Sequence, residues 1–440
     1  MMSSAFRDLL NNPNTSLQDV LLDDCCISAY RYNDNQLVWF LLDRSEEILN
    51  LAIYSTNPKV SLKANLLLSK EYHALIDDIV EKEIFVPTIE RYLDNEPSPA
   101  IICKIANLAA IVYESAASQF SSELLIRFLP HIGDKMILSL YETVLEKAAE
   151  PEQLIPLVTS TLAEISNFTG SITDDVNDEN AVHLGGLYKL TSLFNSNMIL
   201  SEIVQKPENI VILVKKFDVT NINLLDSQWE CIDHYICAEN ASELEKIFVP
   251  VILPLVGISD PTLFHQYQAK LLHIILKLAQ NSENVRKILV EVNFNAELRE
   301  IIETYPHHTL AHLAVTDFII AASRMTELEA LILTQMLPLC EKILSNQDSL
   351  VELRAFAWNL ICKFRDTIKT GNASNNFQES IAAFDEVSSK RVDELSEIAN
   401  SEYGGPLPDL SINADADSFL SNLTQQQVMQ LLRLLTQRPR

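Results

Sequence analysis

Glycine is scarce in this chain, with 8 residues among 440, whereas average usage is about 7%. Tight hairpins, phosphate-binding loops and nucleophile elbows all depend on glycine, because they need a positive φ angle or a close approach of the backbone. Apolar residues make up 48% of the chain, which is enough for a continuous core and too many for a largely disordered protein. The composition therefore predicts α-helices joined by short polar turns.

Apolar side chains recur at the 3.6-residue period of a helix in three stretches. The first follows Ser98-Pro99, which predicts an N-cap and a proline at the first helical position, and Asp260-Pro261 predicts the same start for the second. The three stripes are Ile101, Ile105, Leu108, Ala109 and Val112; Phe264, Tyr267, Leu271, Ile274, Ile275 and Leu278; and Leu353, Phe356, Leu360, Ile361 and Phe364.

This succession of helices predicts an all-α fold, namely an armadillo/HEAT-like helical-repeat solenoid. Self-similarity at about 40 residues is typical of such arrays, in which each helix pair buries its stripe against the next. A compact helical bundle is the alternative, although a single core built from 440 residues would be unusual.

Shifts in composition divide the chain into three parts. We expect a helical-repeat domain over residues 1–370, in which the polar stretch 170–180 is either an exposed loop or a seam in the array. Residues 371–416 predict one polar helix, over Ser380 to Asn400, and then a Gly/Pro linker. Residues 417–440 predict an amphipathic helix, and both docking into a partner and capping of the solenoid are open for it.

The chain is strongly acidic, with 60 acidic and 33 basic side chains and a net charge of −27. This charge disfavours nucleic acid and anionic lipid, which require Lys and Arg. It favours basic surfaces on protein partners, although acids that merely solvate a scaffold explain it as well.

The cysteines and the apolar segments indicate a compartment. Seven scattered cysteines form no disulfide framework and no CxxC motif, and the N-terminus lacks the apolar region of a signal peptide. The longest apolar run, Ile247 to Ile258, is too short to cross about 30 Å of hydrocarbon. We therefore expect no membrane span and a location in the cytoplasm or the nucleus.

Two groups of residues could support chemistry. His308 and His312 have a helical metal-ligand spacing, but no carboxylate lies between them as in a zinc protease. His234 is close in sequence to Cys231 and Cys237, as a Cys–His nucleophile pair would require. We interpret these as surface or helix-start histidines and core cysteines, so a helical metal hydrolase is a remote alternative. No phosphate-loop, nucleophile-elbow or kinase signature occurs. We predict a protein that is not an enzyme and holds no cofactor or metal.

Short motifs, most of them in the first 145 residues, follow the order of a known family. Leu37-Val38-Trp39-Phe40-Leu41 fits a Leu-Ile-x-Phe-Leu motif, and Arg44-Ser45-Glu46 resembles the Arg-Pro-Glu that follows it. His131-Ile132-Gly133 resembles a His-Ile/Leu-Gly segment, and His312-Leu313 resembles a later Gly-His-Leu element. Together these motifs resemble the SAPS family, the regulatory subunits that associate with Sit4/protein-phosphatase-6-type catalytic subunits. The chain departs from the family at Asn35-Gln36, Ser45 and Ala311, where a basic pair, a proline and a glycine are usual.

The resemblance implies recruitment rather than catalysis. A protein of this family would bind a Ser/Thr protein phosphatase catalytic subunit and direct it to other proteins, as substrates or adaptors. The residues beside the motifs that are candidates for this contact are Arg44, His131, Asp134, Lys135 and His312. The main alternative is an armadillo/HEAT-type protein-binding adaptor unrelated to phosphatases.

Overall fold

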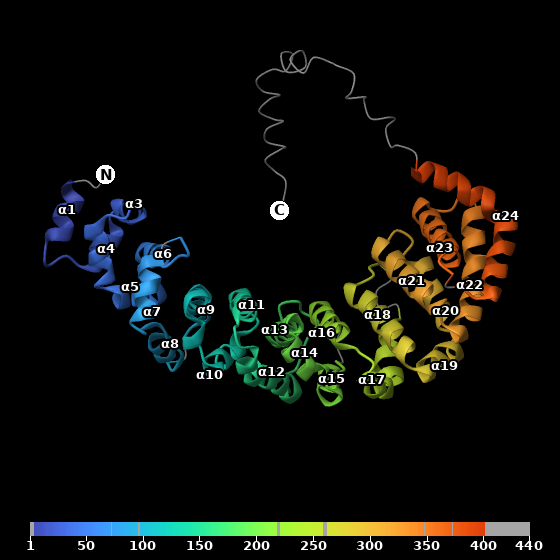
Figure 1. Cartoon of the computed structure of the whole chain (residues 1–440), viewed down its shortest axis with the longest axis horizontal. Helices are drawn as coiled ribbons and strands as arrows, with labels where there is room; N and C mark the ends of the chain where they lie inside the picture. Colours follow the sequence, from blue (N-terminus) through green and yellow to red (C-terminus); the bar gives the residue numbers. More distant parts are fainter. Residues whose placement is uncertain are drawn as a thin grey trace, which may run out of the picture. The chain divides into compact units, whose positions relative to one another are not determined.

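The computed structural model describes residues 4–71, 73–95, 97–217, 221–257, 262–346, 348–371 and 373–400. These residues form 24 α-helices with short 3₁₀ and π segments, and no strand occurs among them (Figure 1). The all-α prediction is therefore confirmed. The amphipathic helix predicted over 417–440 and the Gly/Pro linker before it lie outside the described residues.

The chain divides into two compact units, with the boundary between Leu337 and Pro338. This boundary falls inside helix α22 (Thr326–Ser345). Proline has no backbone N–H, so Pro338 cannot donate the helical hydrogen bond to the carbonyl of Thr334. The domain boundaries expected near residues 370 and 416 stay predictions.

The first unit begins with eight short helices. They are α1 (Ser4–Asn11), α2 (Leu17–Leu22), α3 (Cys25–Arg31), α4 (Asn35–Leu42), α5 (Ser45–Tyr54), α6 (Pro58–Leu67), α7 (His73–Glu81) and α8 (Phe85–Leu93). Polar side chains cap several of them, because the first backbone N–H groups of a helix have no partner inside it. Ser16 and Asp19 form a capping box on α2, and Asp34 accepts hydrogen bonds from the backbone of Gln36 and Leu37 at the start of α4.

The remainder of this unit contains two rows of helices (Figure 1). In the first row each helix packs against the next; its members are α9 (Pro99–Ala116), α11 (Lys135–Lys147), α13 (Glu179–Leu193), α16 (Ile222–Tyr235), α18 (Gln266–Asn281) and α21 (Thr309–Ala322). The second row is α10 (Ser122–Ile126), α12 (Ile155–Asn167), α15 (Pro207–Leu213) and α17 (Ala241–Ile247). Helices α14 (Met198–Gln205), α19 (Glu283–Glu291) and α20 (Phe294–Thr304) lie on the connections.

Many side-chain hydrogen bonds between separate helices join residues about 40 positions apart in the chain. Examples are Lys82 to the carbonyl of Leu42, Gln228 to Tyr188, and His273 to Asp233, each with a separation of 40 residues. Tyr92 to Asn50 spans 42 residues, and the backbone N–H of Tyr267 reaches Asp226 over 41. Each helix layer is therefore tied to a layer one such interval away.

The predicted helix starts have different outcomes. Ser98 is the N-cap residue of α9 and Pro99 occupies its first turn, as predicted. The start predicted at Asp260-Pro261 is wrong, because α18 begins at Gln266; Asp260 and Pro261 themselves lie outside the described residues. The backbone N–H of His265 is bound by Gln268, and that of Tyr267 by Asp226 of α16, so a contact with another helix fixes this end.

Helix α9 is also long and apolar enough, by length and composition, to cross a membrane. Together with the following short turn it forms the segment Pro99–Gln119, one such candidate among the described residues. Its apolar stripe, including Ile105 and Val112, is buried where α9 packs against α5, α7 and α11. A core helix passes the same test, and we interpret α9 as one.

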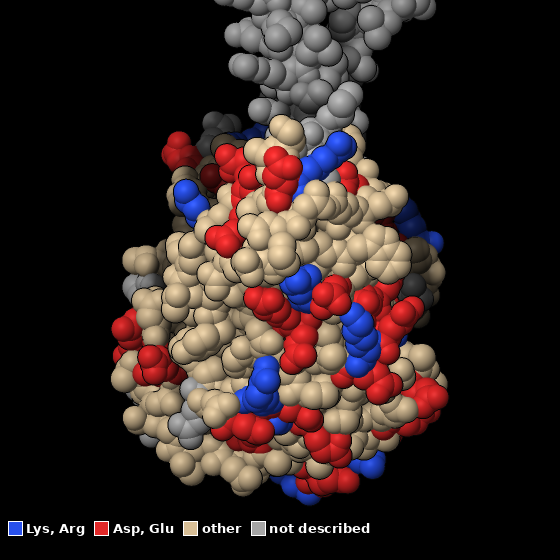
Figure 2. Space-filling model, turned by 90° about the vertical axis from the view of Figure 1, so that its left-hand side faces the viewer, with Lys and Arg blue, Asp and Glu red and all other residues tan. Residues whose placement is uncertain are grey.

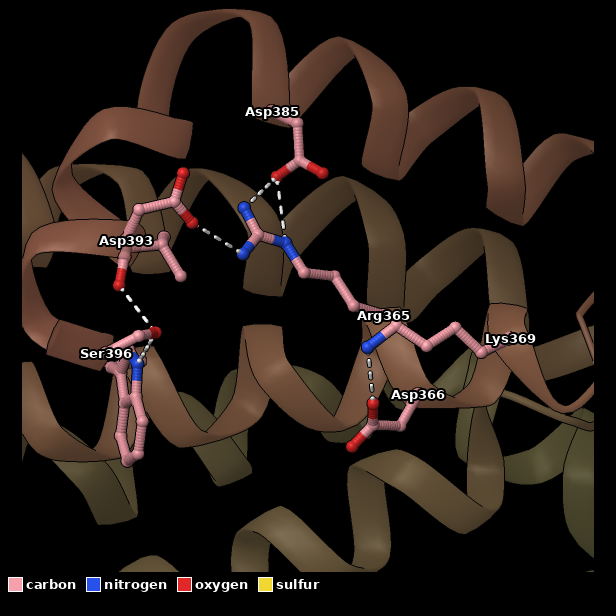
Figure 3. Close-up of polar contacts among 8 residues, drawn as sticks. Arg365, Asp366, Lys369, Asp385, Asp393 and Ser396 are labelled. Atoms are coloured by element: carbon pink, nitrogen blue, oxygen red, sulfur yellow. Dashed lines mark hydrogen bonds and ion pairs between the residues drawn. The ribbon is translucent and has the colours of Figure 1, made fainter. Parts of the chain in front are cut away.

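The second unit contains the end of α22, α23 (Val351–Lys369) and α24 (Asn375–Asn400). The helix predicted over Ser380 to Asn400 is confirmed and begins five residues earlier. Phe364 of the predicted α23 stripe meets Phe377 edge to face, with ring centroids 5.2 Å apart. Arg365 donates to Asp385 at 2.7 Å and to Asp393 at 3.3 Å, so one guanidinium links α23 to two turns of α24 (Figure 3).

Replacing Arg365 with alanine is expected to loosen α24 by about 1–2 kcal/mol, because hydrogen bonds between charged groups are stronger than neutral ones. The Arg365 side chain is 22% exposed, so water screens the contact only in part. Hydrogen exchange of the α24 amides measures the change. The control is Lys369→Ala, which removes an exposed pairing with Asp366 on the same helix and should change stability by less than about 0.5 kcal/mol. Equal effects of both variants would contradict the prediction.

Candidate functional site

The first predicted contact residue, Arg44, lies between α4 and α5. Its guanidinium stacks on the ring of Phe40 at 4.1 Å and donates to the Phe40 carbonyl and the Asp43 carboxylate, both at 3.2 Å. Arg44 therefore braces the junction of the two helices, while about a third of its side chain stays exposed.

The motif Leu37 to Leu41, which lies just before Arg44, also exposes a large aromatic side chain, that of Trp39. Leu37 and Leu41 are buried one turn apart, which places Trp39 on the opposite side of α4, where it is 73% exposed. Sequence reasoning favoured charged residues here and missed Trp39, although the spacing of the two leucines was the available signal. Exposed tryptophans are unusual and are common at the centre of protein interfaces.

The second motif lies at the junction of α9, α11 and α13. His131 ends a 3₁₀ turn, and Asp134 caps α11 by accepting from the backbone N–H of Met136 at 2.8 Å. Both residues line a pocket of about 260 Å³ together with Cys103 of α9 and His183 of α13. Lys135, the next predicted residue, is exposed at the start of α11 but is not among the residues that line this pocket.

Two glycines allow the turn at Gly133 and helix α13 to pack closely together. The turn at Gly133 lies directly on α13, and a Cβ at this position would stand 2.8 Å from Val182. A Cβ at Gly186 would stand 2.6 Å from the carbonyl oxygen of Ile132. The His131-Ile132-Gly133 motif is therefore a packing turn whose position depends on glycine in both partners.

A second pocket of about 390 Å³ adjoins the first and shares Gly133 and Val182 with it. It runs between α13 and α16, and its lining includes Gly185, Lys189, Asp226 and Glu230. We call the two adjoining pockets the α13 groove. The sequence signal for it was the Gly185-Gly186 pair inside a helical stretch of a chain otherwise poor in glycine.

The loop that was expected to be either exposed or a seam forms one wall of the α13 groove. It is an exposed loop between α12 and α13. The Asn221 amide donates to the carbonyls of Thr173 and Asp175 at 3.1 and 2.8 Å, and the Thr173 hydroxyl donates to Asp178 at 2.7 Å. Asp178 in turn caps α13 by accepting from Ala181. The wall is thus fixed by hydrogen bonds at both ends.

The groove is acidic, in keeping with the surface of the chain. Figure 2 shows one face on which Asp and Glu side chains gather in patches, with fewer Lys and Arg among them.

Burial and the neighbouring His183 lower the pKa of His131, so this imidazole is neutral at pH 7. Burial raises the pKa of Asp226, although the hydrogen bond from the Tyr267 backbone opposes the shift.

The two members of the possible nucleophile pair on α16, Cys231 and His234, differ in burial. Cys231 is fully buried in α16, and burial raises the pKa of its thiol to about 12, which disfavours the reactive thiolate. His234 on the same helix is exposed, and Cys237 lies in the loop after it.

The histidines with metal-ligand spacing have different environments. His312 is 8% exposed in α21, so little of its side chain is accessible to a partner, and it does not line the pocket that contains His131 and Asp134. His308 is the N-cap residue of α21 and its ring meets that of Phe264 at 5.9 Å. Among the residues that the structure describes, no group of three or more His, Cys, Asp or Glu side chains could hold a metal ion.

Comparisons with known proteins give no family assignment. A scan against protein-family models finds no matching family, and a search of curated proteins finds no significant match. The resemblance to the SAPS family therefore rests on the sequence motifs alone.

Proposed function

We propose that this protein is a non-catalytic regulatory subunit that binds a Sit4/protein-phosphatase-6-type Ser/Thr phosphatase catalytic subunit and directs its activity. The scaffold would be an armadillo/HEAT-like solenoid, in which stacked helix pairs offer an extended surface. The two helix rows and the hydrogen bonds at intervals of about 40 residues support this, because 40 residues is the length of such repeats.

The observation that carries the proposal is the accessibility of side chains in two of the motifs that carry the resemblance, those at Trp39 and at His131. The first presents Trp39 on the outer side of α4, and the second places His131 and Asp134 at the α13 groove. The exposed Trp39 side chain does not contribute to the core, because Leu37 and Leu41 already supply the buried contacts of α4. Binding is a better explanation than catalysis for accessible groups of this kind, and we expect the complex in the cytoplasm or the nucleus.

The test is affinity purification of the tagged chain from its own cells, followed by mass spectrometry of the bound proteins. A near-stoichiometric phosphatase catalytic subunit of the expected type is the predicted result. Recovery of other partners without any phosphatase would contradict the proposal and favour the protein-binding adaptor.

Replacing Trp39 with alanine should weaken capture of the catalytic subunit by about tenfold or more, because a buried interface tryptophan commonly contributes 2 kcal/mol or more. The fold should be unaffected, since the side chain is 73% exposed in the free protein. Met198→Ala is the matched control, as Met198 is an apolar side chain that is 75% exposed on α14. Equal capture by the Trp39 and Met198 variants would exclude α4 from the contact.

A further inference from the structure

The α13 groove has an apolar floor that the chain itself leaves uncovered. Val176 and Val182 line it and are 53% and 40% exposed. Gly185 is buried on the side of α13 that faces α16, and the nearest atom to a Cβ there would be the Ser227 hydroxyl at 3.7 Å. The floor therefore has room for an aliphatic side chain from another molecule.

The rim of the groove carries an excess of negative charge. Four carboxylates line its two pockets, those of Asp134, Glu179, Asp226 and Glu230, against the single ammonium of Lys189. In the part of the chain that the structure describes, neither Glu230 nor Lys189 forms an ion pair. The carboxylate of Asp226 accepts a hydrogen bond from the Tyr267 backbone through one oxygen, at 2.7 Å.

The groove is also formed in advance of any ligand. Asn221 and Asp178 hold the loop that forms one wall, and the Gly133 turn fixes the other side against α13. A preformed site avoids the entropy cost of ordering a loop when the ligand binds.

We propose that the α13 groove binds a basic segment of a protein partner, with an aliphatic side chain over Val182 and Gly185 and Lys or Arg side chains facing the carboxylates. This inference deepens the proposed function, on which it rests for the identity of the partner. Charge complementarity favours a basic ligand. The four carboxylates would repel a phosphate-bearing molecule or an acidic peptide.

The test uses the purified full chain and a phage-displayed library of short random peptides. Peptides that it selects should be enriched in Lys and Arg around an aliphatic residue. Fluorescence anisotropy with a labelled selected peptide then gives the affinity for each variant. Gly185→Leu, which fills the floor, and Asp226→Asn with Glu230→Gln, which neutralises the rim, should each weaken binding by about tenfold or more.

A control distinguishes the effect of the groove carboxylates on peptide binding from the effect of the acidic surface as a whole. Glu291→Gln with Glu300→Gln removes the same charge from exposed positions on α19 and α20 and should change the affinity by less than about twofold. Gly185→Ala reports on the fold, since its Cβ meets only an ordinary contact. Unchanged binding by Gly185→Leu, or an equal loss in the control, would overturn the proposal.

Displacement of the selected peptide by a synthetic peptide of residues 417–440 would make the chain's own C-terminal segment the occupant and overturn the choice of an external partner.

The peptide assay contains no phosphatase, so its outcome is independent of the proposed function. Groove binding without any phosphatase in the affinity purification would overturn the proposed function alone. A captured phosphatase together with failure of the peptide assay would overturn the groove proposal alone.

Discussion

Replacing Asp233 with alanine is expected to lower the stability of the α16–α18 layer by about 3 kcal/mol. The Asp233 side chain is 6% exposed, and its carboxylate accepts a hydrogen bond from His273 at 3.0 Å. It also forms ion pairs with Lys277 at 2.9 Å and with Lys270 at 3.7 Å. Removing one partner of a buried ion pair commonly costs 3–5 kcal/mol. We expect the lower end of that range, because the two lysines and His273 stay partly exposed.

Hydrogen exchange of the α16 and α18 amides measures this loss locally. The control is Asp366→Asn in the second unit, where an exposed carboxylate pairs with Lys369 at 3.1 Å and should contribute less than about 0.5 kcal/mol. A change of that small size in the Asp233 variant would show that the three basic side chains do not stabilise the layer through this carboxylate.

The contribution of Asp233 should also depend on pH. Burial would raise the pKa of this carboxyl, but the hydrogen bonds from His273 and Lys277 outweigh burial and lower it below the ordinary value. A carboxyl with a lowered pKa in the folded state contributes its full stabilisation above the unfolded pKa of about 3.9. The contribution is lost as pH falls through the folded pKa. The difference between wild type and the Asp233 variant should therefore shrink below about pH 4.

Replacing Gly186 with alanine is the second large expected effect, a destabilisation of about 1–2 kcal/mol. Alanine favours a helix over glycine by up to about 1 kcal/mol, so propensity alone predicts a gain. The new Cβ would stand 2.6 Å from the Ile132 carbonyl oxygen, which belongs to the backbone and cannot move away as a flexible side chain would. Overpacking of this kind costs about 1–3 kcal/mol, which exceeds the gain in helix propensity, so the substitution should destabilise the protein.

The neighbouring glycine supplies the matched control. Gly185→Ala makes the same substitution one position earlier in α13, where the nearest atom to the Cβ lies at 3.7 Å. This variant should be stabilised by up to about 1 kcal/mol. Thermal denaturation followed by circular dichroism compares the two, and a stabilised Gly186 variant would mean that the motif turn does not pack on α13 as described.

The helical content of this chain could be predicted because it depends on neighbouring residues. The third stripe is a clear case, since Phe356, Leu360, Ile361 and Phe364 are buried in α23 as their spacing indicates, while Leu353 at its start is half-buried. The start of α18 could not be predicted in the same way. It depends on Asp226, which is 41 residues from the Tyr267 N–H that it binds.

The candidate site could be predicted in part for the same reason. The motif at His131 and Asp134 was found from local residues, and the structure places both at one pocket. Asp226 and Glu230 join that region only because α16 packs against α13, and no local pattern relates them to Gly133. Trp39 could have been found from the buried leucines on either side of it.

The central claim is that this chain binds a phosphatase catalytic subunit directly. The most direct measurement is to mix the purified chain with the purified Sit4/protein-phosphatase-6-type catalytic subunit of the same cells and determine molar masses by size-exclusion chromatography with light scattering. We expect a complex containing one copy of each protein, and less of this complex with the Trp39→Ala variant. Two separate peaks at the masses of the free proteins would contradict it.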